Sequence, residues 1–409
     1  MKRKKILIIS DSDLRKSFIG RKHYLIKYLS INFDIIIFNP HLYWKEKNEE
    51  YRNYYKYSKE CDVFLKNSLI INGYPIKIHD IYISEMFNFL PNYCLLFKII
   101  TKNKIDIILN FSNVTIGILL RLCRKKIPVI LDLLDYRPGQ VGFSTQSKLP
   151  LISYAQKYIE ILQNYNIKYS EAIVACSEEL RKYALYKSAK KVKLITNGVD
   201  MDLMHPFMNV RIKKNLGFSE KDFIIGYIGG VHWLLDLEMV FNVIQHFSNN
   251  KKEIKLLIVG DGSHLFQYIK LAEKMNILDK VKFVGRVGKF ESPLYINSMD
   301  VGLIPFRKDN VAFYSFPLKI LDYLACGKPV ISSNIPALKK ISKKDEFDKF
   351  IFYADDKETF VYILNEIIDK INDIKNPIHI QNIRNKLINF DWKSLAKEYY
   401  KFLLEVSKI

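Results

Sequence analysis

Short apolar runs alternate with amphipathic stretches along the whole chain. The runs are rich in Ile, Val and Leu on both faces, which is typical of parallel strands covered by helices. In the first half we expect strands at 5–10, 33–38, 105–110, 127–133, 171–177 and 192–196, and helices at 21–31, 93–103, 114–125, 151–169 and 178–187. In the second half we expect strands at 223–229, 254–260, 281–285, 301–306, 329–333 and 350–354, and helices at 235–248, 263–276, 291–298, 317–326 and 357–372.

This alternation predicts an α/β fold with two Rossmann-like domains, each built on a doubly wound parallel sheet. A chain of 409 residues suits two domains of about 200 residues each. We place the first domain at 1–205 and the second at 206–390, with a final helix at 391–409 that starts with Asp391 as its N-cap. Two such domains would face a central cleft, and ligands of open parallel sheets bind in the loops that follow the strands.

Charge and cysteine content narrow the setting. The formal net charge is +21, from 64 Lys and Arg against 43 Asp and Glu, which favours anionic partners. Five cysteines stand far apart without a C-x-x-C spacing, as expected for free thiols in a reducing compartment. The apolar run 6–9 is too short for a signal peptide, and no run is long enough to cross a bilayer. We therefore expect a cytoplasmic protein, with the inner membrane surface as a further place of action.

Two glycine-containing loops are candidates for holding a phosphate. Gly20 stands before a predicted helix, where backbone N–H groups and the helix dipole attract an anion; a plain loop glycine is the alternative. In "YIGGVHW" (227–233), Gly230 ends the first strand of the second domain, a frequent phosphate position. His232 could donate to a phosphate or a sugar hydroxyl, and a packed or solvent-exposed histidine is the alternative. A third loop, "VGDGSH" (259–264), matches a dinucleotide fingerprint only in part, and its Asp261 could cap the next helix.

The stretch "FPLKILDYLACGKPVI" (316–331) combines a helix start with two opposite charges. Pro317 suits the first turn of a helix, so the N–H groups of Phe316, Leu318 and Lys319 would point outward, where a diphosphate could rest. Lys319 adds a positive charge. Asp322 follows on the same helix face, and its carboxylate could accept hydrogen bonds from two ribose hydroxyls. A surface ion pair between Lys319 and Asp322 is the alternative.

Several stretches together resemble a known family. In the second half they are "TNGVDMDLMHP", "GYIGGVHWLLDLEMV", "KLLIVGDG", "KFVGRV", "MDVGLIPF" and "FPLKILDYLACGKPVI". Their order and spacing resemble the GT-B glycosyltransferases of the large retaining family four, also called glycosyl transferases group 1. "GRKHYLIKYLS" and "VILDLLDY" in the first half resemble the teichuronic-acid and exopolysaccharide branch. The resemblance implies an enzyme that moves a sugar from a nucleotide-diphosphate donor, held mainly by the second domain, to a lipid-linked or polysaccharide acceptor, held mainly by the first.

The resemblance also implies roles for individual positions. The segment Ser315, Phe316, Pro317, Leu318 and Lys319 would meet the diphosphate, and Asp322 would take the place of a family Glu that holds the ribose. Arg286 and Val287 would lie at the nucleobase, Gly20 near the phosphates, and the last helix would cross back to the first domain.

The sequence departs from the family at two places. Tyr314 stands where the family has its first paired Glu, which leaves the donor sugar open. The family's Arg and Lys after the first strand of the second domain are missing, and only His232 is offered there. Phosphate neutralisation would then rest more on Lys319, Arg286 and backbone amides.

The chemistry implied is stabilisation of a departing diphosphate by fixed donors. Lys319 and His232 would do this without a metal, and we expect no cofactor besides the donor substrate. The "DSD" run at 11–13 is interpreted as a loop that lines the cleft, with metal contact as the less favoured alternative. Retention of configuration is implied by the resemblance alone. Asp135 is the candidate acceptor-side base, whereas Asp132 could be packed structurally.

Two other classes of protein remain as alternatives. A sugar-nucleotide epimerase could use the same architecture without an acceptor. A nucleic-acid-binding protein would need a basic stripe with interleaved aromatic residues, but Lys and Arg are spread widely, so we expect no nucleic acid partner. The denser basic stretches at 2–27 and 121–126 favour an anionic membrane surface instead. Residues 90–104 could form an amphipathic basic helix for that purpose, or an ordinary half-buried helix.

Overall fold

The computed structural model describes residues 3–39, 58–73, 89–115, 127–141, 150–208, 210–249 and 254–407. The chain divides into two compact units: residues 1–196 together with 392–409, and residues 197–391. The segment 197–205, which we expected in the first domain, therefore belongs to the second unit. This segment is joined to the carboxyl-terminal end of the second unit. The N–H of Val199 donates to the carbonyl oxygen of Phe390 at 2.9 Å, and Val199 forms a β-bridge with Asp391.

The first unit is built on a parallel sheet. Over the described residues it has seven strands in the order β3-β2-β1-β4-β5-β6-β7. They are β1 (Lys5–Ser10), β2 (Asp34–Asn39), β3 (Ser68–Asn72), β4 (Ile107–Phe111), β5 (Val129–Leu133), β6 (Ala172–Ala175) and β7 (Val192–Leu194). Ile6 pairs with Ile35 on one side and Ile107 on the other, and β1 is buried on both faces as its unbroken apolar run predicts. Strand β3 at the sheet edge was not predicted.

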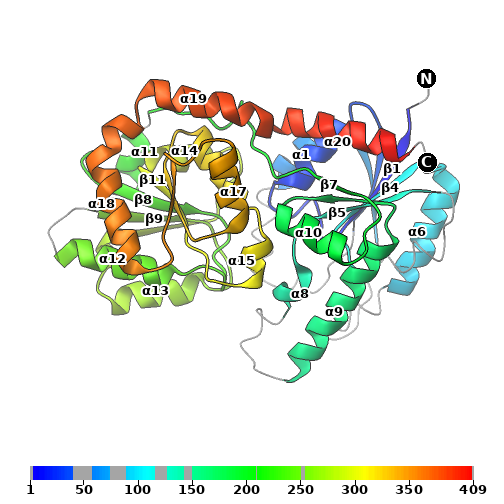
Figure 1. The fold of residues 1–409 in the computed structure, drawn as a ribbon, viewed down its shortest axis with the longest axis horizontal. Coiled ribbons are helices and arrows are strands. Elements are labelled where there is room, and N and C mark those ends of the chain that lie inside the picture. Colours follow the sequence, from blue (N-terminus) through cyan, green and yellow to red (C-terminus); the bar gives the residue numbers. More distant parts are fainter. Residues whose placement is uncertain are drawn as a thin grey trace. The chain divides into compact units, whose positions relative to one another are not determined.

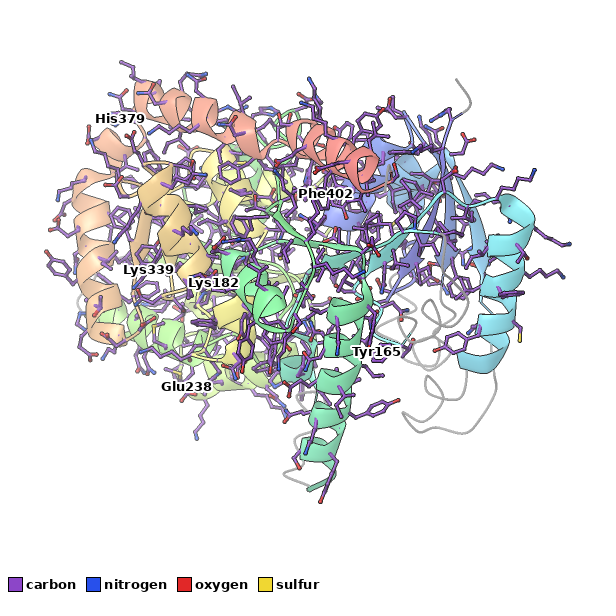
Figure 2. The ribbon with its side chains drawn as sticks, turned by 45° about the vertical axis from the view of Figure 1, so that its right-hand side comes forward. Tyr165, Lys182, Glu238, Lys339, His379 and Phe402 are labelled. Carbon is purple, nitrogen blue, oxygen red and sulfur yellow. The ribbon has the colours of Figure 1, made fainter. Side chains whose placement is uncertain are left out.

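Helices cover this first sheet (Figure 1). They are α1 (Arg21–Leu29), α4 (Ser58–Leu65), α6 (Phe89–Asn103), α8 (Arg137–Gln140), α9 (Pro150–Tyr169), α10 (Glu178–Tyr186) and α20 (Trp392–Val406). The final helix α20 packs on α1, where the rings of Tyr24 and Trp392 are stacked with centroids 5.3 Å apart. Phe402, further along α20 in Figure 2, is buried in the same unit. Most of the helix expected at 114–125 lies outside the described residues.

Residues 90–104, for which the sequence allowed either a membrane-binding helix or an ordinary half-buried helix, lie largely in helix α6. Leu96 and Ile99 on one side of α6 are buried against Leu7 and Ile9 of β1. The helix is therefore half-buried, and its apolar side serves the core of the first unit.

The second unit repeats the architecture. Its described strands form a parallel six-stranded sheet in the order β10-β9-β8-β11-β12-β13. They are β8 (Phe223–Ile228), β9 (Ile254–Val259), β10 (Val281–Gly285), β11 (Val301–Ile304), β12 (Val330–Ser332) and β13 (Ile351–Tyr353). The chain winds outward from β8 to β10, then returns to the other side of β8 with β11. Open parallel sheets bind ligands where the winding direction reverses, which here is between β8 and β11.

The helices of the second unit lie on both faces of its sheet (Figure 1). Helix α12 packs against β9, α13 and α18, whereas α14 packs against β8 and α16 against β11 and β12. These helices are α11 (Val210–Asn215), α12 (Leu237–Asn249), α13 (Leu265–Lys274), α14 (Ser292–Ser298), α15 (Asn310–Tyr314), α16 (Lys319–Ala325), α17 (Pro336–Lys344), α18 (Lys357–Ile374) and α19 (Pro377–Leu387).

One of these boundaries corrects an expectation. Helix α16 begins at Lys319 with Leu318 as its N-cap, so Pro317 precedes the helix and does not occupy its first turn. Both units are thus Rossmann-like, and the predicted fold class is confirmed.

Candidate active site

Lys319 lies at the point of winding reversal in the second sheet. Its Nζ is 4.9 Å from the ring centroid of Tyr227 on β8 and 5.1 Å from that of Phe306, which follows β11. A Cβ placed on Gly229 would be 3.3 Å from this Nζ, so the glycine leaves room for the ammonium beside the loop after β8. Desolvation lowers the pKa of Lys319 to about 8, and the nearby carboxylate of Asp322 opposes this effect. The result is a cation held by two aromatic faces at the expected ligand position.

The imidazole of His232 lies against two glycines. A Cβ on Gly230 would stand 2.4 Å from Nε2 of His232, and a Cβ on Gly262 would stand 2.8 Å from its Nδ1. Both glycines are therefore required for the ring to fold back onto these loops. Desolvation lowers the pKa of His232, the charge of Lys319 acts in the same direction, and Asp261 opposes both. Burial and the Lys319 charge thus both favour the neutral form of the His232 imidazole.

Backbone hydrogen bonds join the loops that carry these side chains. The N–H of Gly229 donates to the carbonyl of Val259 at 2.9 Å, and the N–H of Gly260 donates to that of Gly285 at 2.7 Å. Gly260 has a φ of +135°, and a Cβ there would be 1.9 Å from the carbonyl oxygen of Gly229. These hydrogen bonds hold together the loops that follow β8, β9 and β10. We call the surface formed by these loops and the start of α16 the donor platform.

Two buried tyrosines form hydrogen bonds with the backbone at the end of β8. The hydroxyl of Tyr227 donates to the carbonyl of Gly230 at 2.8 Å, and the N–H of Ile228 donates to the hydroxyl of Tyr323 at 3.0 Å. Tyr323 belongs to α16, so it couples the position of the β8 loop to the helix that carries Lys319.

Arg286 and Val287 follow β10 on the same platform. Val287 packs against the core of the second unit, and the guanidinium of Arg286 acts electrostatically on the Asp261 carboxylate. Desolvation raises the pKa of Asp261, and Arg286 opposes that rise. Asp261 does not cap α13 as the sequence allowed, because His264 occupies the N-cap and no side chain caps that helix.

Asp322 has a partner that the sequence did not indicate. Its Oδ2 accepts a hydrogen bond from Nζ of Lys289 at 3.0 Å, and both side chains are largely buried. Lys319, its neighbour three residues earlier on α16, instead lies over Tyr227 and Phe306. The alternative interpretation, an ion pair between Lys319 and Asp322 on one helix face, therefore does not hold, because Asp322 pairs with Lys289 of the loop after β10.

The segment that precedes α16 is anchored through the backbone of Phe316. The carbonyl of Phe316 accepts a hydrogen bond of 2.7 Å from Nδ2 of the buried Asn197, and the Phe316 ring lies in the core. Ser315 donates its hydroxyl to the carbonyl of Ala312 at 2.9 Å. In the described part of the chain, the N–H groups of Phe316, Leu318 and Lys319 donate to no acceptor, as the prediction of an anion site requires.

The remaining predicted residues belong to the first unit. Gly20 precedes α1, and its N–H donates to Nδ1 of His23 at 3.4 Å. Asp135 follows β5, and Gln163 donates to its carbonyl at 3.0 Å. Desolvation raises the pKa of the Asp135 carboxyl group, and the charge of Lys22 opposes this rise. The raised pKa suits a proton acceptor better than an ordinary surface carboxylate would.

Both aspartates of the "DSD" run are engaged. Asp11 forms ion pairs with Lys22 and Arg137. Asp13 accepts a hydrogen bond of 2.6 Å from Asn39 and lies 3.6 Å from Nε of Arg15. Asp132, in contrast, is buried in an ion pair with Arg21, which agrees with the structural interpretation of that residue. Within the described ranges, no three His, Cys, Asp or Glu side chains group as metal ligands would.

The structure thus gathers most predicted donor-site residues on one platform of the second unit. His232 and Lys319 act on each other electrostatically, and Arg286 acts on the neighbouring Asp261. Sequence reasoning missed Lys289 and Asn197, because each contacts the site across a long stretch of chain. Among the helices of the described residues, none is both long and apolar enough to span a membrane.

Comparison with known families identifies the second unit. Residues 209–382 match the family model described as Glycosyl transferases group 1. These residues form a glycosyltransferase domain of that family, which confirms the resemblance to glycosyl transferases group 1 for this part of the chain. Retention of configuration and the branch of the family stay predictions.

Two relatives extend the similarity beyond this domain. A Bacillus subtilis (strain 168) protein named as a teichuronic acid biosynthesis glycosyltransferase is 25% identical over 259 residues, which are 62% of this chain and 61% of that protein. An Escherichia coli UDP-Gal:alpha-D-GlcNAc-diphosphoundecaprenol alpha-1,3-galactosyltransferase is 26% identical over 308 residues, covering 72% of this chain and 73% of that enzyme. The chain thus spans less than two thirds of the first relative.

Solved structures support the fold over almost the whole length. Sucrose-phosphate synthase from Thermosynechococcus elongatus superposes with a TM-score of 0.73 at 16% identity, covering 99% of both chains. Anabaena HepE, solved in complex with UDP-glucose, gives a TM-score of 0.70 at 13% identity over 98% of this chain and 99% of that one. The chain therefore has the GT-B fold.

Proposed function

We propose that this protein transfers a sugar from a nucleoside-diphosphate donor to a lipid-linked or polysaccharide acceptor in cell-surface glycan synthesis, with retention of configuration. The observation that carries the proposal is Lys319, held over Tyr227 and Phe306 where the winding of the second sheet reverses. The E. coli relative acts on a diphosphoundecaprenol-linked acceptor, as its name states, and HepE was solved with UDP-glucose.

The proposed chemistry is the departure of a nucleoside diphosphate. The bond between the anomeric carbon and the β-phosphate oxygen breaks, and its electron pair leaves with the phosphate. The acceptor hydroxyl oxygen bonds to the anomeric carbon from the same face that the phosphate leaves, as retention requires, and its proton passes to the proposed base Asp135. Lys319, the N–H groups before α16 and the His232 imidazole would stabilise the charge that develops on the diphosphate.

The proposal needs neither a metal nor a resident cofactor. The charge of the leaving group would be met by Lys319 and Arg286, which take over from the family's missing Arg and Lys. Metal binding by Asp11 and Asp13 would first have to displace Lys22, Arg137 and Asn39 from these carboxylates.

Asp135 remains the proposed acceptor-side base. It follows β5 in the first unit, and its raised pKa favours proton uptake. Asp135→Asn should retain donor binding and lose turnover by about a hundredfold. Unchanged turnover with normal donor binding would remove this role.

A thermal-shift panel of nucleoside diphosphates and their sugars tests the donor site. Binding at a hundred times Kd should stabilise the protein by about 2.7 kcal/mol, and Asp322→Ala should reduce that effect. Absence of any shift with all nucleotides tested would contradict the proposal. Incubation with the donor alone distinguishes a transferase from a sugar-nucleotide epimerase. Only the epimerase would produce an isomerised sugar without an acceptor.

We also propose that the first unit contacts an anionic bilayer. The amino-terminal half of α9 extends away from the first sheet (Figure 1). It exposes Tyr154 (72%), Tyr158 (41%) and Ile161 (57%) at the i, i+4, i+7 spacing of one helix face, with exposed Lys157 between them. Tyrosine rings and lysines together favour the interface of a membrane with anionic lipids.

Sedimentation with phosphatidylglycerol vesicles tests this surface. Replacing Tyr154, Tyr158 and Ile161 with Ser should weaken vesicle binding about tenfold. Tyr362→Ser, at an exposed tyrosine of α18, is the matched control and should have no effect. No binding of the unaltered protein at low salt would overturn the membrane proposal.

A further inference from the structure

The ion pair between Lys289 and Asp322 is partly shielded from solvent. Its side chains are 17% and 13% exposed, so it is neither a solvated surface pair nor a fully buried one. A surface pair would contribute little, whereas a largely desolvated pair holds its two partners in one geometry. The pair also joins two elements of the donor platform, the loop after β10 and the start of α16.

Lys289 itself is fixed by its own loop. Its carbonyl accepts a hydrogen bond of 2.7 Å from the Ser292 hydroxyl at the start of α14. The N–H of the preceding Gly288 donates to Oε2 of Glu291 at 3.1 Å. The backbone of Lys289 is therefore anchored, and its ammonium is presented to Asp322 from a defined position.

Asp322 has one oxygen occupied and one available. In the described part of the structure, Nζ of Lys289 is the one hydrogen-bond donor to its carboxylate, and it binds Oδ2. A carboxylate can accept about four hydrogen bonds, so Oδ1 retains its full capacity. Aspartate is one methylene shorter than glutamate, so its carboxylate reaches a smaller region, and the hydrogen bond from Lys289 selects the rotamer that it takes there.

We propose that Lys289 is a positioning residue, which holds Asp322 so that Oδ1 faces the ribose hydroxyls of the donor nucleotide. This inference rests on the proposed function, since it assumes a nucleotide on the platform. It adds that ribose recognition depends on the cation of another loop, which fixes the rotamer of the Asp322 carboxylate. Without the ammonium, Asp322 would lose its fixed orientation and the site would lose preference for a nucleotide with ribose hydroxyls.

The test compares a nucleoside diphosphate with its 2′,3′-dideoxy form. The tightest binder among UDP, GDP, ADP and CDP is titrated calorimetrically, and then its dideoxy analogue. The unaltered protein should bind the ribose form about tenfold more tightly, as expected for a hydrogen bond to a charged group. Lys289→Met should reduce that preference to less than about threefold. Lys289→Arg, which can still donate to Asp322, should restore it.

Controls separate this role from others. Lys343→Met removes an exposed charge from α17 of the same unit and should leave the preference unchanged. If Lys289→Met does not fold, Lys289→Gln takes its place and should give an intermediate preference, because its amide is a weaker donor.

Three results would overturn the inference in different ways. Full ribose preference in Lys289→Met would show that Asp322 needs no support. Equal weakening for both nucleotides would mean that Lys289 contacts the diphosphate directly. Failure of the unaltered protein to bind any of the four nucleotides would instead refute the proposed function itself.

Discussion

The hydroxyl of Tyr399 on α20 donates a hydrogen bond of 3.1 Å to Oδ2 of Asp132 on β5, across 267 positions of sequence. Asp132 also receives Nε of Arg21 at 3.1 Å, and Nη1 of Arg21 donates to the carbonyl of Ile195 at 2.9 Å. All three side chains are buried. The final helix is thus tied to the first sheet through a buried ion pair.

Removing the charge of Asp132 should destabilise the protein strongly. Asp132→Asn leaves the Arg21 guanidinium buried without a counter-charge, which should cost about 3 kcal/mol or more. Tyr399→Phe removes a single hydrogen bond and should cost about 1 kcal/mol. Urea denaturation of each variant measures these changes. Glu405→Gln breaks the exposed pair with Lys191 and should have almost no effect; a comparable loss there would refute the burial argument.

The buried His23 should make the protein sensitive to acid. Burial lowers its pKa from 6.5 to about 4, although its Nε2 bonds the carbonyl of Leu14 at 2.8 Å. Because the unfolded chain binds this proton more tightly, stability is full above pH 6.5 and falls towards pH 4, by roughly 3 kcal/mol in total. His23→Gln should flatten that part of the stability curve. His379→Gln, at a surface histidine, should not change the slope.

Gly260 should tolerate no side chain. A Cβ there would meet the carbonyl of Gly229 at 1.9 Å, and the φ of +135° disfavours any other residue. Gly260→Ala should cost at least about 2 kcal/mol and weaken nucleotide binding, because it parts the loops after β8 and β9. Gly217→Ala is the control: its φ is +81°, nothing lies within 4 Å, and about 1 kcal/mol without loss of binding is expected. Thermal melts with and without nucleotide report both effects.

The charge of Lys319 should set an alkaline limit to donor use. With a pKa of about 8 in the unliganded protein, its ammonium is present below pH 8 and lost above it. The kcat/KM for donor should therefore fall about tenfold per pH unit above that value. Lys319→Met should lose roughly a hundredfold or more at pH 7. Lys319→Arg should shift the limit beyond the measurable range, and an unchanged limit in that variant would assign it to another group.

The sequence predicts the type and order of elements well, because an unbroken run such as Ile6–Ile9 can only be buried on both faces. It misses β3, whose five residues "SLIIN" are partly exposed at the sheet edge and carry little apolar signal. It places Pro317 inside a helix, whereas the structure holds that segment through Asn197. Helical spacing could put Lys319 and Asp322 on one face, but no local pattern points to Lys289.

The two units are completed at different times as the chain is synthesised. The second unit is one continuous segment, so all of its residues leave the ribosome before Trp392 does. The first unit must wait for α20, which brings Trp392 against Tyr24 and Tyr399 against Asp132. Until α20 is synthesised, the core of the first unit lacks the side chains of this helix, so its apolar surface stays exposed for longer than that of the second unit.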